Sequence, residues 1–319
     1  MKKSYRKVAV FYEAINQWGG AEKVLLDILK IFPHADLFTL IHKPVKWLPK
    51  NIKVFTPPLF FKKYDLVIST GAHITHWLNA DVYYFHNINR HLYNNKFLRI
   101  FGFIDKLFLR KNKLYLCNSQ TVQTRLKHTF GIDAKIVYPG IDIKKYIPKY
   151  KKPQDYYLIV SRFVPYKKVD LAILACQELG KKLIVVGQGR QEKYLNKIAN
   201  TRYVNFVKTK NEDELISLYQ NCKAFIFPQY EDLGLTAIES QACGRPVIAY
   251  NKGGALETVI DNKTGLYFNK QTIESLKDAI LKFEKKTFKS IDCHKNSLKF
   301  SSSHFMLNFN KLINDYLKK

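Results

Sequence analysis

The feature of the sequence that most constrains its fold is a regular alternation of short apolar runs with segments of helical pattern. The runs at Lys7–Ala14, Tyr156–Arg162 and Ala224–Pro228 have strand length and are almost uninterrupted, which is typical of strands buried on both faces of a sheet. Helical patterns follow, for example at Gly19–Phe32 and Val169–Leu179. The alternation predicts an α/β chain whose sheets are parallel and covered by helices.

One segment interrupts this alternation. Lys144–Asp155 combines prolines with many charges, as linkers do. A chain of 319 residues with 46% hydrophobic residues can form two domains of ordinary size. We therefore expect one domain at residues 1–150 and a second at 151–300. Residues 301–319 carry apolar side chains at helical spacing, and we expect this helix to pack back onto the first domain.

The cysteines and the apolar runs indicate a cytoplasmic chain. The five cysteines are scattered and lack a CxxC pair, which favours reduced thiols over disulfides or a zinc site. No run approaches the roughly 18 apolar residues of a membrane span. The apolar stretch near the N-terminus is short and contains Glu13, so we expect a first strand and not a secretion signal.

The net charge of +27 indicates partners that carry phosphate, whether nucleic acid, anionic lipid or a phosphorylated substrate. A lysine-rich composition that only solvates the surface is the alternative. No helix-turn-helix, RNA-recognition or zinc signature is present, so we expect no specific nucleic-acid partner, and a basic nucleic-acid-binding protein is the non-enzyme alternative.

Two acids bracket a helix start after one of the predicted strands. Ligands of open parallel sheets bind beyond the carboxyl ends of the strands, and unpaired N–H groups at a helix start favour phosphate. Glu231 and Glu239 are eight positions apart. If all eight steps were helical they would be separated by about 12 Å, too far for the roughly 5 Å of a nucleophile–acid pair. They therefore suit different parts of one elongated ligand; an ordinary helix-start acid and a solvated glutamate are the alternative.

A basic loop follows the first strand of the second predicted domain. Arg162 and Lys167 lie on either side of Pro165, just before a helix. An arginine grips a diphosphate through its planar fork and a lysine through a point charge. The loop therefore predicts a second contact to the same ligand.

These stretches resemble the family 4 retaining glycosyltransferases. EDLGLTAIES matches their E-x7-E motif, and SRFVPYKKVDLAI resembles their R-x5-K phosphate loop, with Lys168 where a glycine is usual. Further landmarks follow in the family's order: CNSQTVQTRL, VYPGIDIKKY, VVGQGR and VIAYNKGGALETVIDNKTGLYF. The resemblance implies a GT-B fold, α/β with two doubly wound Rossmann-like domains facing a cleft. It also implies transfer with retention and with neither a metal nor a cofactor.

The resemblance also implies roles for individual residues. Glu231 is expected to hold the donor sugar and Glu239 the ribose, while Arg162 and Lys167 neutralise the leaving diphosphate, whose stabilisation lowers the barrier. Further donor-binding positions are Gly19, Gly20, Gly187, Gly234, Leu235 and Thr236. A bare pair of glycines before a helix also occurs without any ligand.

The stretch YYFHNINRHLY resembles a Tyr/His/Pro/Arg stretch of mannosyltransferase-like members, with Asn89 in place of the usual proline. The resemblance implies a catalytic role for His86 at the reacting sugar and an acceptor-phosphate contact for Arg90. It favours GDP-mannose as the donor, while UDP-glucose, UDP-GlcNAc and UDP-galactose remain alternatives. Three other histidines have no such pattern and are expected to be structural or exposed: His73, His76 and His91.

Two segments suggest where the acceptor is found. Phe97–Arg110 has an apolar helical stripe with cations around it, and Pro57–Lys63 combines aromatic residues with lysines. Both suit contact with lipid headgroups, although a core-facing helix explains the first equally. We expect a peripheral protein on the anionic inner leaflet that uses a glycan or lipid-linked acceptor. A nucleotide-sugar epimerase and a sugar phosphorylase are the enzyme alternatives.

Overall fold

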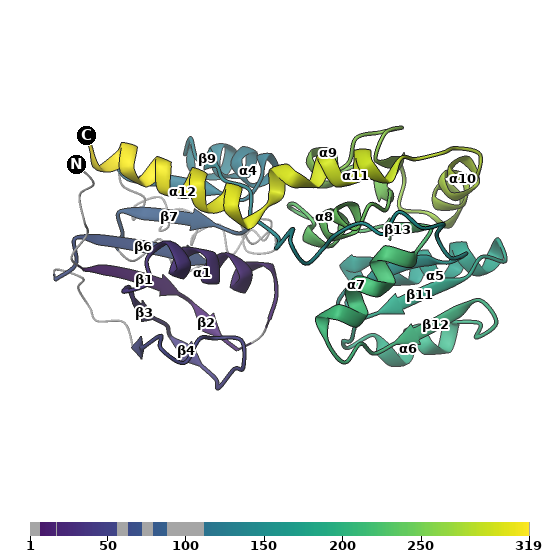
Figure 1. Cartoon of the computed structure of the whole chain (residues 1–319), viewed down its shortest axis with the longest axis horizontal. Coiled ribbons are helices and arrows are strands. Elements are labelled where there is room, and N and C mark those ends of the chain that lie inside the picture. The colour runs from purple at the N-terminus through teal and green to yellow at the C-terminus, as the bar shows by residue number, and fades with distance from the viewer. Residues whose placement is uncertain (1–6, 17, 56–62, 72–78, 88–111, 319) are drawn as a thin grey trace. The chain divides into compact units, whose positions relative to one another are not determined.

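A computed structural model describes residues 7–16, 18–55, 63–71, 79–87 and 112–318 of the chain (Figure 1). The chain divides into two compact units. Unit 1 consists of Met1–Gly140 with Ser302–Lys319, and unit 2 of Ile141–Ser301. Each unit has its own parallel sheet, and the predicted α/β class with two doubly wound, Rossmann-like units is confirmed.

The described part of unit 1 contains a seven-stranded parallel sheet in the order β5-β3-β1-β6-β7-β8-β9. The strands are β1 (Val8–Tyr12), β3 (Asp36–Phe38), β5 (Val54–Phe55), β6 (Leu66–Gly71), β7 (Val82–Phe85), β8 (Leu114–Cys117) and β9 (Lys135–Ile136). A small parallel pair joins β2 (Ala14–Ile15) to β4 (Ile41–His42). The strand order reverses between β1 and β6, which makes their carboxyl ends the switch point where ligands of such sheets bind.

Helices cover the sheet of unit 1 and include the C-terminal one. Within the described residues of this unit they are α1 (Gly20–Ile31), α4 (Gln120–Phe130) and α12 (Ser302–Leu317). The helix α12, yellow in Figure 1, packs beside α1 and buries Phe305, Phe309 and Ile313 in the core of this unit. At about 1.5–3 kcal/mol for each large apolar side chain, these three contribute roughly 5–9 kcal/mol to holding the helix, as an upper bound.

Unit 2 contains a six-stranded parallel sheet in the order β12-β11-β10-β13-β14-β15 within the described residues. Its strands are β10 (Tyr157–Val160), β11 (Leu183–Val186), β12 (Val204–Val207), β13 (Ala224–Phe227), β14 (Val247–Tyr250) and β15 (Gly265–Phe268). In chain order this is 3-2-1-4-5-6, the arrangement of nucleotide-binding doubly wound sheets. The switch point lies between β10 and β13, which pair through Tyr157 with Ala224 and Leu158 with Phe225.

The helices of unit 2 connect these strands and bury its core. They are α5 (Val169–Glu178), α6 (Glu192–Ile198), α7 (Glu212–Asn221), α8 (Leu235–Ala242), α9 (Ala255–Thr258), α10 (Ile273–Glu284) and α11 (Ser290–Ser297), with the 3-10 turns η2 (Pro165–Lys167) and η3 (Leu298–Phe300). The side chains of β10 and β11 pack against α5 and α10, which contact each other. A second group of helices, with α8 on β13 and β14 and α7 and α11 beside it, adds to the cover that the apolar strands require.

The boundary between the units lies after Gly140, whereas the sequence indicated a position near residue 150. The lysine-rich segment Lys144–Asp155 is held to unit 2. Tyr146 is buried and donates to Glu212 at 3.1 Å. Arg245 donates to the carbonyl groups of Lys149 and Lys151 at 3.3 and 3.2 Å. The prolines and charges of this segment are typical of a linker. The single buried side chain of Tyr146 produces no periodic pattern, so the sequence does not reveal that the segment is packed.

All five cysteines are buried thiols outside any disulfide: Cys117 in unit 1, and Cys176, Cys222, Cys243 and Cys293 in unit 2. Within the described part of the chain, no helix is both long enough and apolar enough to span a membrane. The predicted helix at Phe97–Arg110 lies outside the described residues, as does Pro57–Lys63 apart from its last residue.

Candidate functional site

Two loops meet at the switch point of unit 2. One follows β10 and carries Arg162 and Lys167; the other follows β13 and carries Glu231. Because β10 and β13 are neighbours in the sheet, their carboxyl ends bring the two loops together. Lys167 Nζ forms an ion pair with Glu231 Oε1. The cation and the acid that the sequence assigned to one ligand therefore lie side by side.

The environment of Lys167 changes its ionisation. Its side chain is only 12% exposed. Burial, and then the positive charge of Arg162, lower the pKa of Lys167 to about 7, while Asp232 opposes the change. Near neutral pH this amine is therefore poised between its charged and neutral forms, and a bound anion would favour the charged one.

The remaining loop residues set the position of Arg162. This guanidinium is exposed, and its Nη2 donates to Tyr166 Oη at 2.9 Å. The turn η2 ends at Lys168, whose φ of 53° and ψ of 37° are left-handed. Glycine adopts this conformation freely, but another residue incurs about 1–2 kcal/mol, so Lys168 strains the turn where the resemblance predicts glycine.

The helix α8 begins directly behind the acidic loop. Its first residues, Leu235 and Thr236, follow Gly234, whose φ of 94° is left-handed. A Cβ at Gly234 would lie 2.4 Å from Phe227 Cζ, so this turn requires glycine. No side chain caps α8, and the first N–H groups of a helix have no partner within it. This end of α8 can therefore receive an anion.

A glycine-rich loop holds the backbone of the acid. The N–H of Gly254 donates to the carbonyl of Glu231 at 2.8 Å, and a Cβ at Gly254 would lie 2.2 Å from Leu233 Cα. In the sequence this loop is a family landmark without an assigned role. Gly187 follows β11 and packs closely on the first loop, since a Cβ there would lie 1.8 Å from the carbonyl oxygen of Ser161.

Glu239 lies on α8 and is 4% exposed, so it is not the solvated surface glutamate of the alternative interpretation. Its Oε2 accepts a hydrogen bond from Tyr219 Oη at 3.0 Å. Tyr219 is fully buried on α7. Sequence reasoning missed this tyrosine, because an aromatic residue on an amphipathic helix looks like any other core residue.

In unit 1 the two glycines lie at the start of α1. Gly19 precedes the helix in an extended conformation, and Gly20 is its first residue. Glu22, in the first turn, is buried and accepts from Tyr12 Oη at 2.7 Å. A Cβ at Gly19 would lie 3.2 Å from Glu22 Oε2, so the glycine leaves room for this carboxylate, which the sequence analysis did not single out.

His86 follows β7 at the carboxyl edge of the sheet of unit 1. Its Nε2 lies 2.8 Å from Thr70 Oγ1, and its carbonyl accepts from Asn118 Nδ2 at 2.6 Å. Burial lowers the pKa of His86 to about 3, so its imidazole is neutral at physiological pH. Four further residues considered in the sequence lie outside the described residues: His73, His76, Arg90 and His91.

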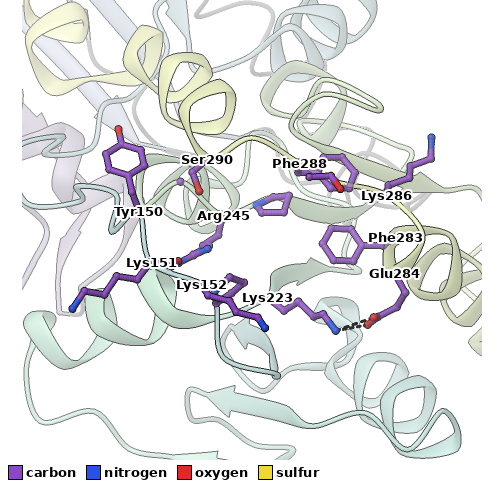
Figure 2. Close-up of a pocket in the computed structure, with 14 residues that line it drawn as sticks. Tyr150, Lys151, Lys152, Lys223, Arg245, Phe283, Glu284, Lys286, Phe288 and Ser290 are labelled. Atoms are coloured by element: carbon purple, nitrogen blue, oxygen red, sulfur yellow. Dashed lines mark hydrogen bonds and ion pairs between the residues drawn. The ribbon is translucent and has the colours of Figure 1, made fainter.

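A hollow of about 450 Å³ lies at the opposite edge of the sheet of unit 2, next to residues that precede β13 and β14 (Figure 2). Its lining contains several cations and none of the predicted donor-binding residues. Lys223 is paired with Glu284 at 2.8 Å, the dashed line in Figure 2. Arg245 donates to backbone carbonyls, including that of Gln220 at the end of α7. Because these charges are already partnered, we do not assign the ligand site here.

No group of three or more histidine, cysteine, aspartate or glutamate side chains that could hold a metal ion is present in the described ranges. Metal independence stays a prediction.

Two doubly wound units, one with cations, acids and a free helix start at its switch point, define a protein of the nucleotide-binding GT-B class. The chain belongs, through its second unit, to the family described as Glycosyl transferases group 1, whose model matches residues 142–300.

The relatives are similar over part of the chain. An uncharacterised glycosyltransferase of Methanocaldococcus jannaschii is 30% identical over 170 residues, which cover 52% of this chain and 48% of the relative. A GDP-mannose-dependent alpha-(1-6)-phosphatidylinositol monomannoside mannosyltransferase of Mycobacterium tuberculosis is 30% identical over 192 residues, which cover 51% and 50%. The chain thus spans about half the length of the curated relatives it matches.

The fold is similar over nearly the whole chain. The crystal structure of Anabaena HepE in complex with UDP and glucose has a TM-score of 0.77 at 20% identity and covers 96% of this chain and 99% of its own.

Proposed function

We propose that the protein is a retaining glycosyltransferase that moves a hexose from a nucleotide-diphosphate sugar to a glycan or lipid-linked acceptor. The observation that carries the proposal is the switch point of unit 2. There Lys167 is paired with Glu231, and the charge of Arg162 acts on Lys167. The helix α8 begins at Leu235, and its N-cap residue Gly234 lies three positions after this acid. Cations and N–H groups suit a diphosphate, and a carboxylate suits the hydroxyl groups of a sugar.

In this reaction the bond between the anomeric carbon and the diphosphate oxygen breaks, and both of its electrons leave with the diphosphate. Lys167 and Arg162 stabilise this charge, together with the N–H groups of Leu235 and Thr236. Glu231 exchanges its ion pair with Lys167 for the hydroxyl groups of the sugar. The acceptor hydroxyl forms the new bond to the anomeric carbon on the same face, and its proton passes to the departing diphosphate oxygen. No metal takes part in this proposal.

The identity of the donor is the finer part of the proposal. GDP-mannose is favoured by the His86 stretch and by the GDP-mannose-dependent mycobacterial relative. A UDP-sugar is the alternative, favoured by the similarity to Anabaena HepE in complex with UDP and glucose. Because the imidazole of His86 is neutral, its role is a hydrogen bond to the sugar and not a positive charge.

We also propose that unit 1 rests on an anionic membrane surface. Exposed apolar side chains on this unit support the idea: Trp18, Leu40 and Ile41 are each about half exposed. Exposed Lys43 and Lys46 follow them in the chain. Apolar side chains with cations around them suit headgroup-level contact. Sedimentation with vesicles of anionic lipid at low salt tests it, and a protein that stays in the supernatant contradicts it.

The experiment for the enzyme is a donor panel. The protein is titrated with GDP-mannose, UDP-glucose, UDP-GlcNAc and UDP-galactose, and release of nucleoside diphosphate is followed with candidate acceptors. We expect one base to be bound preferentially. Glu231→Ala should abolish release while thermal unfolding stays unchanged, and Glu178→Ala, which removes an acid paired with Lys277 away from the site, is the control. Near-full turnover by Glu231→Ala would refute the role of this acid.

An epimerase converts donor without acceptor, and a phosphorylase requires inorganic phosphate, so the same panel separates both from a transferase. DNA binding that survives high salt, with no turnover of any donor, would favour the nucleic-acid-binding alternative instead.

A further inference from the structure

The carboxylate of Glu239 is held by a tyrosine from the neighbouring helix. Tyr219 Oη donates to Glu239 Oε2 at 3.0 Å, and the bond links α7 to α8 inside the core. Both side chains are at least nine-tenths buried. The last torsion of a glutamate side chain is broad, so this contact restricts the orientation of the Glu239 carboxylate.

The hydroxyl of Tyr219 acts only as a donor in this contact. Burial, and then the negative charge of Glu239, raise the pKa of Tyr219 far above its ordinary value. The phenol therefore keeps its proton at neutral pH and donates a hydrogen bond to the carboxylate. Glu239 receives this donor on Oε2, and carboxylate oxygens are acceptors for the hydroxyl groups of a sugar.

The ring of Tyr219 is itself fixed. Tyr146 packs against it edge to face, with ring centroids 6.3 Å apart and an interplanar angle of 63°. The ring of Phe225, on β13, is tilted relative to that of Tyr219, and the two ring centroids are 5.6 Å apart. Because the ring is held by neighbouring aromatic side chains, the hydroxyl stays at one place relative to α8.

We propose that Tyr219 is a positioning residue of the donor site, which orients the Glu239 carboxylate toward the ribose hydroxyls of the nucleotide. The inference rests on the proposed function, in which Glu239 binds this ribose. It predicts that Tyr219 sets how strongly the site distinguishes a ribose from a sugar that lacks these hydroxyls.

The test compares Tyr219→Phe with the unchanged protein, using GDP, UDP and their 2′,3′-dideoxy counterparts as probes in calorimetric titrations. We expect the affinity for the ribonucleotide to fall about tenfold, the size of one hydrogen bond to a charged group. The affinity for the dideoxynucleotide should stay within about twofold, so the ratio of the two affinities should collapse. In turnover assays KM for the donor should rise while kcat changes little.

Tyr157→Phe is the matched control. It also removes a buried hydroxyl that donates to a carboxylate, that of Glu284, but it leaves the Tyr219–Glu239 bond in place. Tyr219→Phe leaves a buried carboxylate with one donor fewer, so the double variant Tyr219→Phe/Glu239→Gln keeps the test usable if the single variant unfolds. In the Glu239→Gln background, Tyr219→Phe should cause no further loss of ribonucleotide affinity.

Two outcomes overturn the inference. One is a Tyr219→Phe variant that keeps the ratio of ribonucleotide to dideoxynucleotide affinity, and the other is a further, additive loss in the Glu239→Gln background. If Glu239→Gln weakens ribonucleotide binding while Tyr219→Phe does not, the positioning role fails and the proposed function stands. If neither Glu239→Gln nor Arg162→Ala affects the binding of any nucleotide, the proposed function itself fails.

Discussion

The lowered pKa of Lys167 predicts a characteristic pH dependence. Burial and Arg162 bring this pKa to about 7, so the ammonium form is lost as the pH rises through that value. The fully formed donor is a diphosphate diester whose charge is constant in this range. We therefore expect kcat/KM, which reports ionisation in the free enzyme, to fall about tenfold for each pH unit above roughly 7. Initial rates at donor concentrations well below KM, from pH 6 to 9, measure it.

Lys167→Arg is the decisive variant, because a guanidinium stays charged throughout this range. The descending limb should disappear in this variant, even if its rate at pH 6 is lower. Lys193→Arg, on the exposed face of α6, is the matched control and should keep the descending limb. If Lys167→Arg retains the same limb, another group is responsible, and Lys167 does not supply the charge that meets the diphosphate.

Three further outcomes are expected. Arg162→Ala should weaken the binding of nucleoside diphosphate roughly 10- to 100-fold in calorimetric titrations, because it removes a charged donor from the diphosphate; unchanged affinity would exclude that contact. Lys168→Gly should raise the free energy of unfolding by roughly 0.5–1 kcal/mol, since relief of the left-handed strain exceeds the added entropy of the unfolded chain; urea denaturation measures it, and a loss of stability would contradict it. Phe309→Ala should lower that energy by about 3–5 kcal/mol for unit 1 through the cavity left under α12, and a loss below about 1 kcal/mol would mean that the helix is not docked there.

The fold class could be predicted because central strands such as β1, β7 and β13 are apolar and buried on both faces, a property that local sequence records directly. The sequence also placed Lys167 and Glu231 on one ligand, because each residue follows a strand and the carboxyl ends of parallel strands lie at one edge of the sheet. What the pattern could not give was which strands are neighbours. The adjacency of β10 and β13 depends on a crossover that no local pattern records.

The parts of the site that were missed depend on side-chain contacts between distant positions. Tyr219 and Tyr146 are ordinary aromatic residues in the sequence, and only the fold places their hydroxyl groups against Glu239 and Glu212. The domain boundary was misplaced for a related reason. Arg245, about 95 positions downstream, binds the carbonyls of the lysine-rich segment and makes it part of unit 2.

The five buried thiols have a practical consequence. Burial raises the pKa of each of the four cysteines of unit 2, so a thiolate-specific alkylating reagent cannot modify them while that unit is closed. Alkylation of these four sulfur atoms under native conditions would therefore report the transient opening of unit 2, and alkylation of Cys117 would report the opening of unit 1 separately. Mass spectrometry of the labelled peptides could follow the alkylation rates of both units in one sample, without a spectroscopic label on the protein.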